Sequence, residues 1–270
     1  MFGGLALNVN HLQPGVQGLP GSGSDLAAEL MTRVTDLGVE MLFEPVTSVQ
    51  PASDGSLHVA TAVSSHSAHC VVVASGARMR KLGVPGEDAF EKRGVSQCAD
   101  CDAPLHKGQT VVVVGGGDSA LQETLVLAEF CSDVHLVHRR SAFGGRSEFA
   151  EAVRSSPRVH VHLGTVVDAI VGDQYVTGVR LRRPASGETS ELPCNGIFPY
   201  VGLEPNTDFL AASLKIEGGS VRVDGKLETS WPNVFAVGAV RAGYAGQLTD
   251  AVRDAMGVVE TISSRRLGHA

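Results

Sequence analysis

A run of valines that leads directly into three glycines constrains the fold of this chain more than any other stretch. Residues 110–120 read Thr-Val-Val-Val-Val-Gly-Gly-Gly-Asp-Ser-Ala. They match the G-x-G-x-x-A form of the dinucleotide-binding fingerprint, in which a strand turns tightly into an amphipathic helix. An ordinary glycine-rich β-turn is the alternative, although it does not account for the strand and helix patterns on either side. The candidate pyrophosphate-binding residues are Gly115, Gly116, Gly117, Asp118 and Ser119.

Strand patterns alternate with helix patterns along the chain, which is typical of a parallel, doubly wound α/β architecture. The predicted strands are residues 39–43, 57–63, 70–73, 110–114, 133–137, 159–163, 175–182, 197–201 and 234–237. The predicted helices are residues 24–37, 119–130, 147–154 and a long final one from about residue 247. Ser24 is expected to cap the first helix, and Leu37 to end its apolar stripe. The apolar positions of the last helix are Leu248, Val252, Ala255, Met256, Val259 and Ile262.

Composition limits the possible partners and location. The chain has 270 residues, 43% of them apolar, and a formal net charge of −7, as expected for a soluble protein of two domains. The acidic balance argues against nucleic acid or an anionic membrane as the main partner. The first residues do not resemble a signal peptide, and no apolar run is long enough to span a bilayer. Five cysteines is an odd number, so we expect a cytoplasmic protein rather than a secreted disulfide framework.

The end of the strand predicted at 133–137 indicates which nicotinamide cofactor the fingerprint would bind. NAD-dependent dehydrogenases place an acidic residue about twenty positions after the glycines, where it bonds the ribose 2′-hydroxyl. This chain has His138, Arg139 and Arg140 in that region and no acid. Two guanidinium groups would pair with a 2′-phosphate, so the cluster favours NADPH over NADH. A solvent-exposed basic edge without a ligand is the alternative.

A pair of cysteines, Cys98-Ala-Asp-Cys101, stands just ahead of the valine strand and is followed by Asp102. A C-x-x-C next to a βαβ pattern is typical of a redox pair, and Asp102 would supply or accept the proton that disulfide cleavage requires. A zinc site would need further ligands, and we expect His160 and His162 to face opposite sides of their strand. No metal site is therefore predicted. Two buried structural thiols are the remaining alternative, which does not account for Asp102.

Further motifs in the same order make the chain resemble the low-molecular-weight thioredoxin reductases. The matching segments are Gly3-Gly4, Pro14-Gly15, Ala74 to Gly76, Gln97 to Asp102, Gly115 to Ala120, Val134 to Arg140, Gly202 to Asn206 and Val234 to Gly238. The resemblance implies two doubly wound dinucleotide-binding domains. An FAD-type domain would consist of residues 1–82 and 201–270, with an NADPH domain inserted at residues 83–200.

The resemblance also implies a role for each site residue. Cys101 corresponds to the cysteine that faces the flavin, Cys98 to the one that attacks the substrate disulfide, and Asp102 to the acid. The residues expected near the FAD are Ser75, Gly76, Gly238 and Gln247. The implied activity passes electrons from NADPH through FAD to this dithiol, and on to thioredoxin or another dithiol protein, in a homodimer. In such enzymes the NADPH domain rotates, so that nicotinamide and disulfide reach the flavin in turn.

Departures from the family pattern mainly concern the flavin. Family members begin with a strand and a G-x-G-x-x-G loop that hold the FAD pyrophosphate, and no such loop precedes the valine strand here, so we expect a truncated FAD-type domain. Ala239 replaces the acid that bonds the flavin chain, and Leu12 replaces an asparagine. Gly144 replaces the third arginine of the NADPH motif, although Arg146 lies nearby, and Ala103 replaces a glycine after the dithiol.

These departures lead us to expect weak FAD binding or none. Two alternative functions follow from that expectation. One is a flavin-free, NADPH-binding redox sensor that descends from the same family. The other is a flavin-dependent dithiol oxidase, against which the basic NADPH cluster argues.

Overall fold

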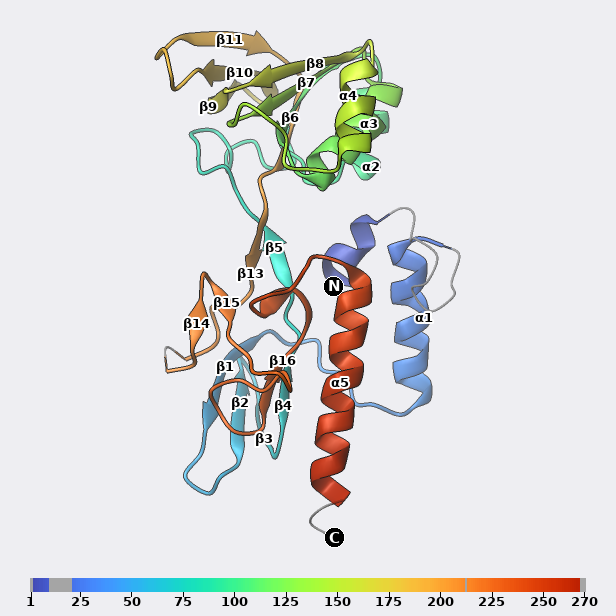
Figure 1. The fold of residues 1–270 in the computed structure, drawn as a ribbon, viewed down its shortest axis with the longest axis vertical. Coiled ribbons are helices and arrows are strands. Elements are labelled where there is room, and N and C mark those ends of the chain that lie inside the picture. The colour runs from blue at the N-terminus through green and yellow to red at the C-terminus, as the bar shows by residue number, and fades with distance from the viewer. Residues whose placement is uncertain (1, 10–20, 212, 268–270) are drawn as a thin grey trace. The chain divides into compact units, whose positions relative to one another are not determined.

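A computed structural model describes residues 2–9, 21–211 and 213–267, and its chain forms two compact units (Figure 1). The first unit combines Met1–Arg78 with Glu204–Ala270, and the inserted unit is Met79–Leu203. Two short paired strands, β5 (Ala77–Met79) and β13 (Leu203–Pro205), contain the points where the chain passes from one unit to the other. The motif positions Leu12, Pro14 and Gly15 lie outside the described residues.

The inserted unit is built on a parallel four-stranded sheet in the order β12-β6-β7-β8. Its strands are β6 (Thr110–Gly115), β7 (Asp133–His138), β8 (Val159–Leu163) and β12 (Gly196–Tyr200). One face is covered by α2 (Ala99–Asp102), the 3-10 turn η2 (Ala103–His106), α3 (Asp118–Phe130) and α4 (Ser147–Ser155) (Figure 1). Val111 and Val113 are fully buried in the core on this face, together with Leu121 and Phe198.

A three-stranded antiparallel sheet in the order β11-β10-β9 covers the opposite face of the parallel sheet (Figure 1). Its strands are β9 (Val166–Gly172), β10 (Val176–Arg182) and β11 (Thr189–Pro193). Val112 and Val114 of β6 pack in a core with Ile170 and Val179 of this second sheet. Both faces of β6 are therefore buried, which explains why a continuous valine run suits this position. The predicted strand and helix between residues 110 and 130 lie within one residue of their expected bounds.

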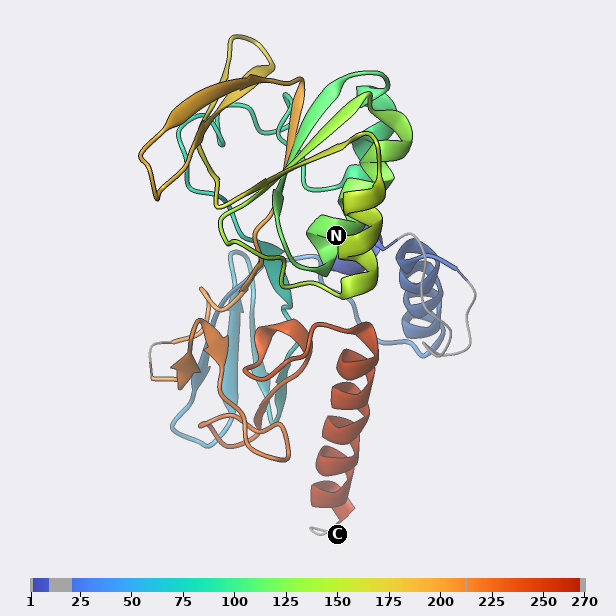
Figure 2. The same ribbon diagram turned by 45° about the horizontal axis from the view of Figure 1, so that its top comes forward.

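The first unit combines an antiparallel sheet, a parallel strand pair and two helices of several turns. The antiparallel sheet runs in the order β1 (Val46–Pro51), β2 (Leu57–Thr61) and β3 (Ser65–Ala68), and β4 (Val71–Val73) pairs in parallel with β16 (Val234–Ala236). The other elements are η1 (Gly4–Asn8), α1 (Gly23–Asp36), β14 (Ile216–Glu217), β15 (Ser220–Val221), η3 (Gly238–Val240) and α5 (Leu248–Leu267). Figures 1 and 2 show α5 beside the β4–β16 pair, where Val258 packs with Phe235 and Val237.

The helix α1 begins earlier than predicted. Its N-cap is Ser22 rather than Ser24, because the Ser22 side chain accepts a hydrogen bond from the Asp25 N–H at 3.2 Å. The Asp25 carboxylate in turn accepts one from the Ser22 N–H at 2.8 Å, which completes a capping box. Leu37 is 78% exposed at the C-cap, so the apolar stripe ends before it.

The strand predicted at residues 39–43 is wrong. In the part of the chain that the structure describes, this segment pairs with no strand, and Val39, Leu42 and Phe43 are 53%, 48% and 77% exposed. A strand needs a hydrogen-bonded neighbour, and a short apolar run does not reveal whether one exists.

The buried face of α5 agrees with the predicted apolar stripe only in part: Leu248, Val252 and Ile262 are half-buried, and Ile262 packs beside Val258. Met256 and Val259 are each 62% exposed, whereas Asp254 and Val258 are only 6% and 2% exposed. The apolar spacing missed Asp254 because an acidic residue is expected to face solvent, whereas here it is buried in a pair with Arg241.

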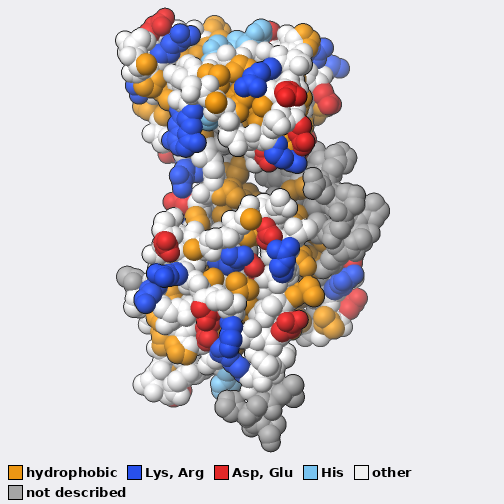
Figure 3. Space-filling view, viewed as in Figure 1, with side chains coloured by type: hydrophobic (Ala, Val, Ile, Leu, Met, Phe, Trp, Pro, Cys, Tyr) orange, Lys and Arg blue, Asp and Glu red, His pale blue; other side chains and the backbone are white. Residues whose placement is uncertain are grey.

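The surface carries charges of both signs. On the face shown in Figure 3, Lys and Arg side chains are interspersed with Asp and Glu. No helix in the described ranges is long and apolar enough to cross a membrane.

Candidate active site

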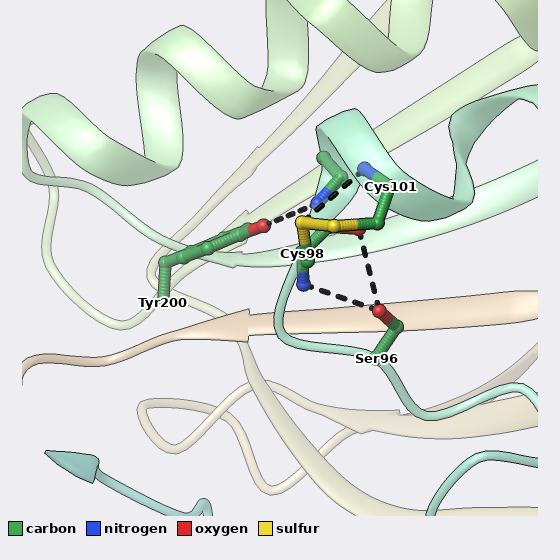
Figure 4. The surroundings of a disulfide bond; sticks show 5 residues. Ser96, Cys98, Cys101 and Tyr200 are labelled. Carbon is green, nitrogen blue, oxygen red and sulfur yellow. Dashed lines mark hydrogen bonds between the residues drawn. A yellow bond between two sulfur atoms is a disulfide. The ribbon is translucent and has the colours of Figure 1, made fainter. Parts of the chain in front are cut away.

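Cys98 and Cys101 form a disulfide at the start of α2, with their Cα atoms 5.3 Å apart (Figure 4). Cys98 is the N-cap of the helix, and its Sγ accepts a hydrogen bond from the Cys101 N–H at 3.2 Å. The Cys98 N–H donates to the Ser96 hydroxyl at 3.1 Å. A backbone donor directed at Sγ stabilises negative charge on that sulfur, so the local geometry suits Cys98 as a thiolate.

Asp102 is the last residue of α2 and is half-buried, and its N–H donates to the Cys98 carbonyl at 3.2 Å. The next residue, Ala103, is fully buried in the core beneath the helices. Ala103 has an ordinary right-handed helical conformation. Alanine therefore fits at this position, where the family pattern has glycine.

The three glycines of the loop between β6 and α3 differ in whether a side chain would fit at each position. A Cβ at Gly115 would lie 2.4 Å from the Tyr200 carbonyl oxygen and 2.6 Å from the Ala120 Cβ, so strand and helix pack too closely for a side chain. A Cβ at Gly116 would lie 2.4 Å from the His138 ring. A Cβ at Gly117 would meet nothing within 4 Å. The loop therefore leaves space at the start of α3, where backbone N–H groups favour a pyrophosphate.

The predicted basic cluster lies at the end of β7, the strand next to β6 in the sheet. Arg139 and Arg140 are exposed, and neither guanidinium has an acidic partner among the described residues. The His138 side chain lies against Gly116, its Nε2 is 3.1 Å from the Ala142 carbonyl oxygen, and burial lowers its pKa. The two free guanidinium groups and the open loop fit a nucleotide that carries a 2′-phosphate.

The segment after the basic cluster folds back onto the glycine loop. The N–H groups of Gly144 and Gly145 both donate to the Gly116 carbonyl, at 2.8 and 3.0 Å. Arg146 is bound to Asp118 and also lies 3.2 Å from a Glu148 carboxylate oxygen. Arg146 is therefore close to the site, but acidic neighbours neutralise its charge.

The candidate flavin residues of the first unit meet at one edge of its parallel strand pair. Gly76 follows β4 and Gly238 follows β16, both with left-handed backbone at φ 65° and 68°, which favours glycine. Gln247 immediately precedes α5, and a Cβ at Gly238 would lie 3.5 Å from the Ala251 side chain of that helix. The Ser75 hydroxyl donates to the carbonyl oxygen of Asn206, which directly follows β13, at 2.8 Å. Ligands of α/β folds bind outside the carboxyl ends of such strands, so this edge fits a dinucleotide.

Two features of this edge reduce the number of hydrogen-bonding groups that are available to a flavin. Ala239 has no side-chain acceptor, and the Gly238 N–H already donates to Asp254 at 2.9 Å. Burial would raise the pKa of Asp254, but hydrogen bonds from Arg241 and Gly238 outweigh it and lower that pKa. The carboxylate of Asp254 is thus charged and holds Arg241 at 2.6 Å.

Three histidines of the inserted unit share one face of the parallel sheet. The His135 Nδ1 lies 2.9 Å from the His162 Nε2, and the rings of His135 and His160 stack at 4.8 Å. The predicted opposite orientation of His160 and His162 is wrong, because residues two apart on a strand point to the same face. Burial, followed by the charges of His162 and His160, lowers the pKa of His135 to about 4. Within the described ranges, no group of three or more His, Cys, Asp and Glu could hold a metal ion.

Sequence reasoning missed two residues near α2, the helix that carries the disulfide. The Tyr200 hydroxyl accepts a hydrogen bond from the Ala99 N–H at 2.9 Å, and Glu123 lies on α3, which shares a core with α2. Tyr200 ends an otherwise apolar strand, and a buried tyrosine hydroxyl usually needs a partner. That signal could have singled it out.

Comparisons with known proteins agree with this geometry. Residues 7–255 match the family model described as pyridine nucleotide-disulphide oxidoreductase. The thioredoxin reductase of Treponema pallidum (strain Nichols) is 35% identical over 254 residues, which cover 93% of this chain and 82% of that protein. Among solved structures, the Lactococcus lactis thioredoxin reductase in its FR conformation has a TM-score of 0.89 and 30% identity, over 97% of this chain and 86% of that one. The T. acidophilum thioredoxin reductase has a TM-score of 0.86 and 28% identity, over 98% of this chain and 88% of that one.

Proposed function

This chain belongs to the thioredoxin reductase family of pyridine nucleotide-disulphide oxidoreductases, and from that premise we propose its electron path. Electrons pass from NADPH, by way of FAD, to the Cys98–Cys101 disulfide and then to a disulfide of thioredoxin or another dithiol protein. The observation that supports this path best is the disulfide itself, which lies in the same compact unit as an open glycine loop and two unpaired arginines.

We assign the inserted unit to NADPH. The glycine loop from Gly115 to Ser119 would bind the pyrophosphate through backbone N–H groups and the N-terminus of α3. Arg139 and Arg140 would bind the 2′-phosphate. The His138 side chain, which lies against Gly116, would hold the loop in place.

We assign the first unit to FAD, which when bound accepts a hydride from a nicotinamide and passes two electrons to a disulfide. Gly76, Gly238, Ser75 and Gln247 would hold it at the carboxyl edge of the β4–β16 pair. Because Ala239 offers no acceptor, we expect the affinity to be about tenfold or more below that of an otherwise equal site with an acid there.

The dithiol would act by exchange. The Cys98 thiolate attacks the substrate disulfide and forms a mixed disulfide, and one substrate thiolate leaves and takes a proton from Asp102. Asp102 then takes the proton of the Cys101 thiol, and the Cys101 thiolate attacks the Sγ of Cys98. This restores the Cys98–Cys101 bond and expels the second substrate sulfur as a thiolate, to which Asp102 returns the proton. The Cys101 N–H that donates to the Cys98 Sγ supports Cys98 as the attacking thiolate.

The test is an assay of NADPH oxidation coupled to reduction of thioredoxin by the purified full chain supplied with FAD. We expect turnover that Cys98→Ser and Cys101→Ser abolish. A wild-type protein that binds both cofactors but reduces no dithiol protein would refute the proposal.

A flavin-free redox sensor is the second candidate, and the Ala239 side chain together with the occupied Gly238 N–H favours it. The two candidates differ in one measurement. The sensor would bind NADPH and cycle its cysteines while retaining no FAD after gel filtration, and the reductase would retain FAD in proportion to protein.

Assembly and location stay predictions. We propose a homodimer, which light scattering at micromolar concentrations would test, and a cytoplasmic location, which cell fractionation would test.

A further inference from the structure

A buried tyrosine that the proposed function does not use contacts the helix that carries the disulfide. Tyr200 is only 7% exposed, and its hydroxyl accepts the Ala99 N–H at 2.9 Å. Figure 4 shows this side chain pointing at the first turn of α2. Since Ala99 directly follows Cys98, the hydroxyl fixes the backbone beside a redox cysteine.

Glu123 of α3 is a second residue that the proposed function does not use. Its Oε2 atom is buried and has no hydrogen-bond partner among the described residues. A buried charged oxygen without a donor is costly, whereas a protonated carboxyl group loses much less on burial. The surroundings of Glu123 therefore favour its neutral form.

Groups on α2 and β12 act on this carboxyl. Burial and then the charge of Asp100 raise the pKa of Glu123 to about 7, and a hydrogen bond from Tyr200 opposes the shift. Burial, followed by the charges of Glu123, Asp100 and Asp102, raises the pKa of Tyr200, so the phenol stays protonated. Asp100 and Asp102 flank Cys101 on α2, so any further negative charge on that helix would act on Glu123 in the same direction as Asp100 does.

We propose that Glu123 takes up a proton when the Cys98–Cys101 disulfide is reduced, and that Tyr200 couples this proton to the redox helix. The disulfide and the Glu123 carboxylate accept two electrons and two protons, and become one thiolate, one thiol and one carboxylic acid. The S–S bond breaks, the electrons come from the reductant, and the protons come from water. The new thiolate on α2 disfavours the ionised form of Glu123, and this repulsion drives the uptake.

Glu123 and Tyr200 are positioning residues in this scheme, because they act through α2 and not on the reacting sulfurs. The inference rests on the proposed function only in requiring that the two cysteines cycle. In the oxidised protein Glu123 is ionised above about pH 7 and neutral below it. Glu123 should therefore oppose reduction of the Cys98–Cys101 disulfide above about pH 7 but not below it.

The experiment measures the fraction of reduced Cys98–Cys101 pair in the full chain, equilibrated in dithiothreitol buffers from about pH 6 to about pH 8.5. We expect Glu123→Gln to shift the equilibrium toward the dithiol by about 3–10-fold at the upper end and by less than about twofold at the lower end. We expect Tyr200→Phe to raise the pH above which Glu123 opposes reduction of the disulfide, because it removes the hydrogen bond that favours the Glu123 carboxylate. Glu129→Gln, an exposed position on the same helix, is the matched control and should follow wild type throughout.

Parallel profiles of wild type and Glu123→Gln at every pH would overturn the inference and leave the proposed function intact. If the cysteines fail to cycle at all, the proposed function itself is wrong. A second measurement needs no variant: the infrared difference spectrum of wild type, reduced minus oxidised, should gain a carboxylic acid C=O band above pH 7. The absence of that band would equally overturn the inference.

Discussion

Arg146 donates two hydrogen bonds to the carboxylate of Asp118, from its backbone N–H at 2.7 Å and from its Nε at 3.1 Å. Arg146 therefore does not supply an uncommitted charge to the glycine loop, although it lies close to that loop in space. Arg139 and Arg140 are the guanidinium groups of the cluster that remain available to a 2′-phosphate.

We expect the double substitution Arg139→Ala, Arg140→Ala to remove most of the preference for NADPH over NADH. Charge-assisted hydrogen bonds contribute about 1.5–3 kcal/mol each, so the preference should fall by about a hundredfold or more. Arg146→Ala is the control and should change the preference by less than about threefold, because that arginine is paired. Calorimetric Kd values for both nucleotides test this. Equal affinities in the wild type would contradict it.

The two glycines at the ends of the G-x-G motif should respond differently to alanine. Gly115→Ala places a Cβ 2.4 Å from the Tyr200 carbonyl, so we expect a lower Tm and loss of NADPH binding together. Gly117→Ala enters open space, so we expect an unchanged Tm but NADPH binding weakened about tenfold or more, because the Cβ fills the pyrophosphate position. Thermal melts and NADPH titrations on both variants check this. A Gly117→Ala variant that binds NADPH normally would count against the assignment of the loop.

The Cys98–Cys101 pair should account for the redox-sensitive thiols. Thiol titration of the denatured protein should give two fewer thiols after mild oxidation, and dithiothreitol should restore both. Cys98→Ser should abolish the change, whereas Cys70→Ser should leave it intact. A wild-type thiol count that does not respond to oxidation would contradict the redox role.

The stability of the inserted unit should fall in mild acid because of the half-buried His135. Burial lowers the pKa of His135 from 6.5 to about 4, so the unfolded chain binds more protons between those values. The unfolding free energy should therefore be highest above about pH 6.5 and decline toward pH 4, by roughly 1–3 kcal/mol for this residue after allowing for solvent screening.

Urea unfolding at several pH values measures this decline. His135→Asn should flatten it, because asparagine keeps a donor or acceptor near the position of Nδ1 but does not titrate in this range. His69→Asn, an exposed histidine of the first unit, is the control and should leave the decline in place.

The ion pair of Arg241 and Asp254 should stabilise the fold more than the pair of Arg253 and Asp250 on α5. Their side chains are only 15% and 7% exposed, so Asp254→Ala would leave a largely buried charge unpaired, at a cost of about 3–5 kcal/mol. Adding Arg241→Met should recover much of this loss. Arg253→Ala breaks the pair with Asp250, in which the removed arginine is 76% exposed, and should cost less than about 1 kcal/mol. Equal effects of Asp254→Ala and Arg253→Ala in chemical unfolding would contradict the prediction.

The local motifs were predictable because each depends on neighbouring residues. The valine strand and the glycine loop require small residues at fixed spacing, and the structure has β6 and α3 within one residue of the expected bounds. The C-x-x-C spacing likewise allowed a disulfide within a single helical turn, which the structure contains. Arg139 and Arg140 could be singled out in the same way, since their distance from the glycines along the chain was sufficient.

Tertiary structure decided the features in which distant residues meet. Asp254 is buried only because Arg241 pairs with it, and periodicity counts a carboxylate as solvent-facing. Residues 39–43 look like a strand but pair with none in the described chain, because pairing depends on a partner that lies elsewhere. Tyr200 reaches Ala99 because β12 and α2 share one core, and only that contact reveals a polar partner beneath the dithiol. Spacing along the chain thus determined which local motifs the protein has. Packing determined which distant side chains are buried beside those motifs and influence them.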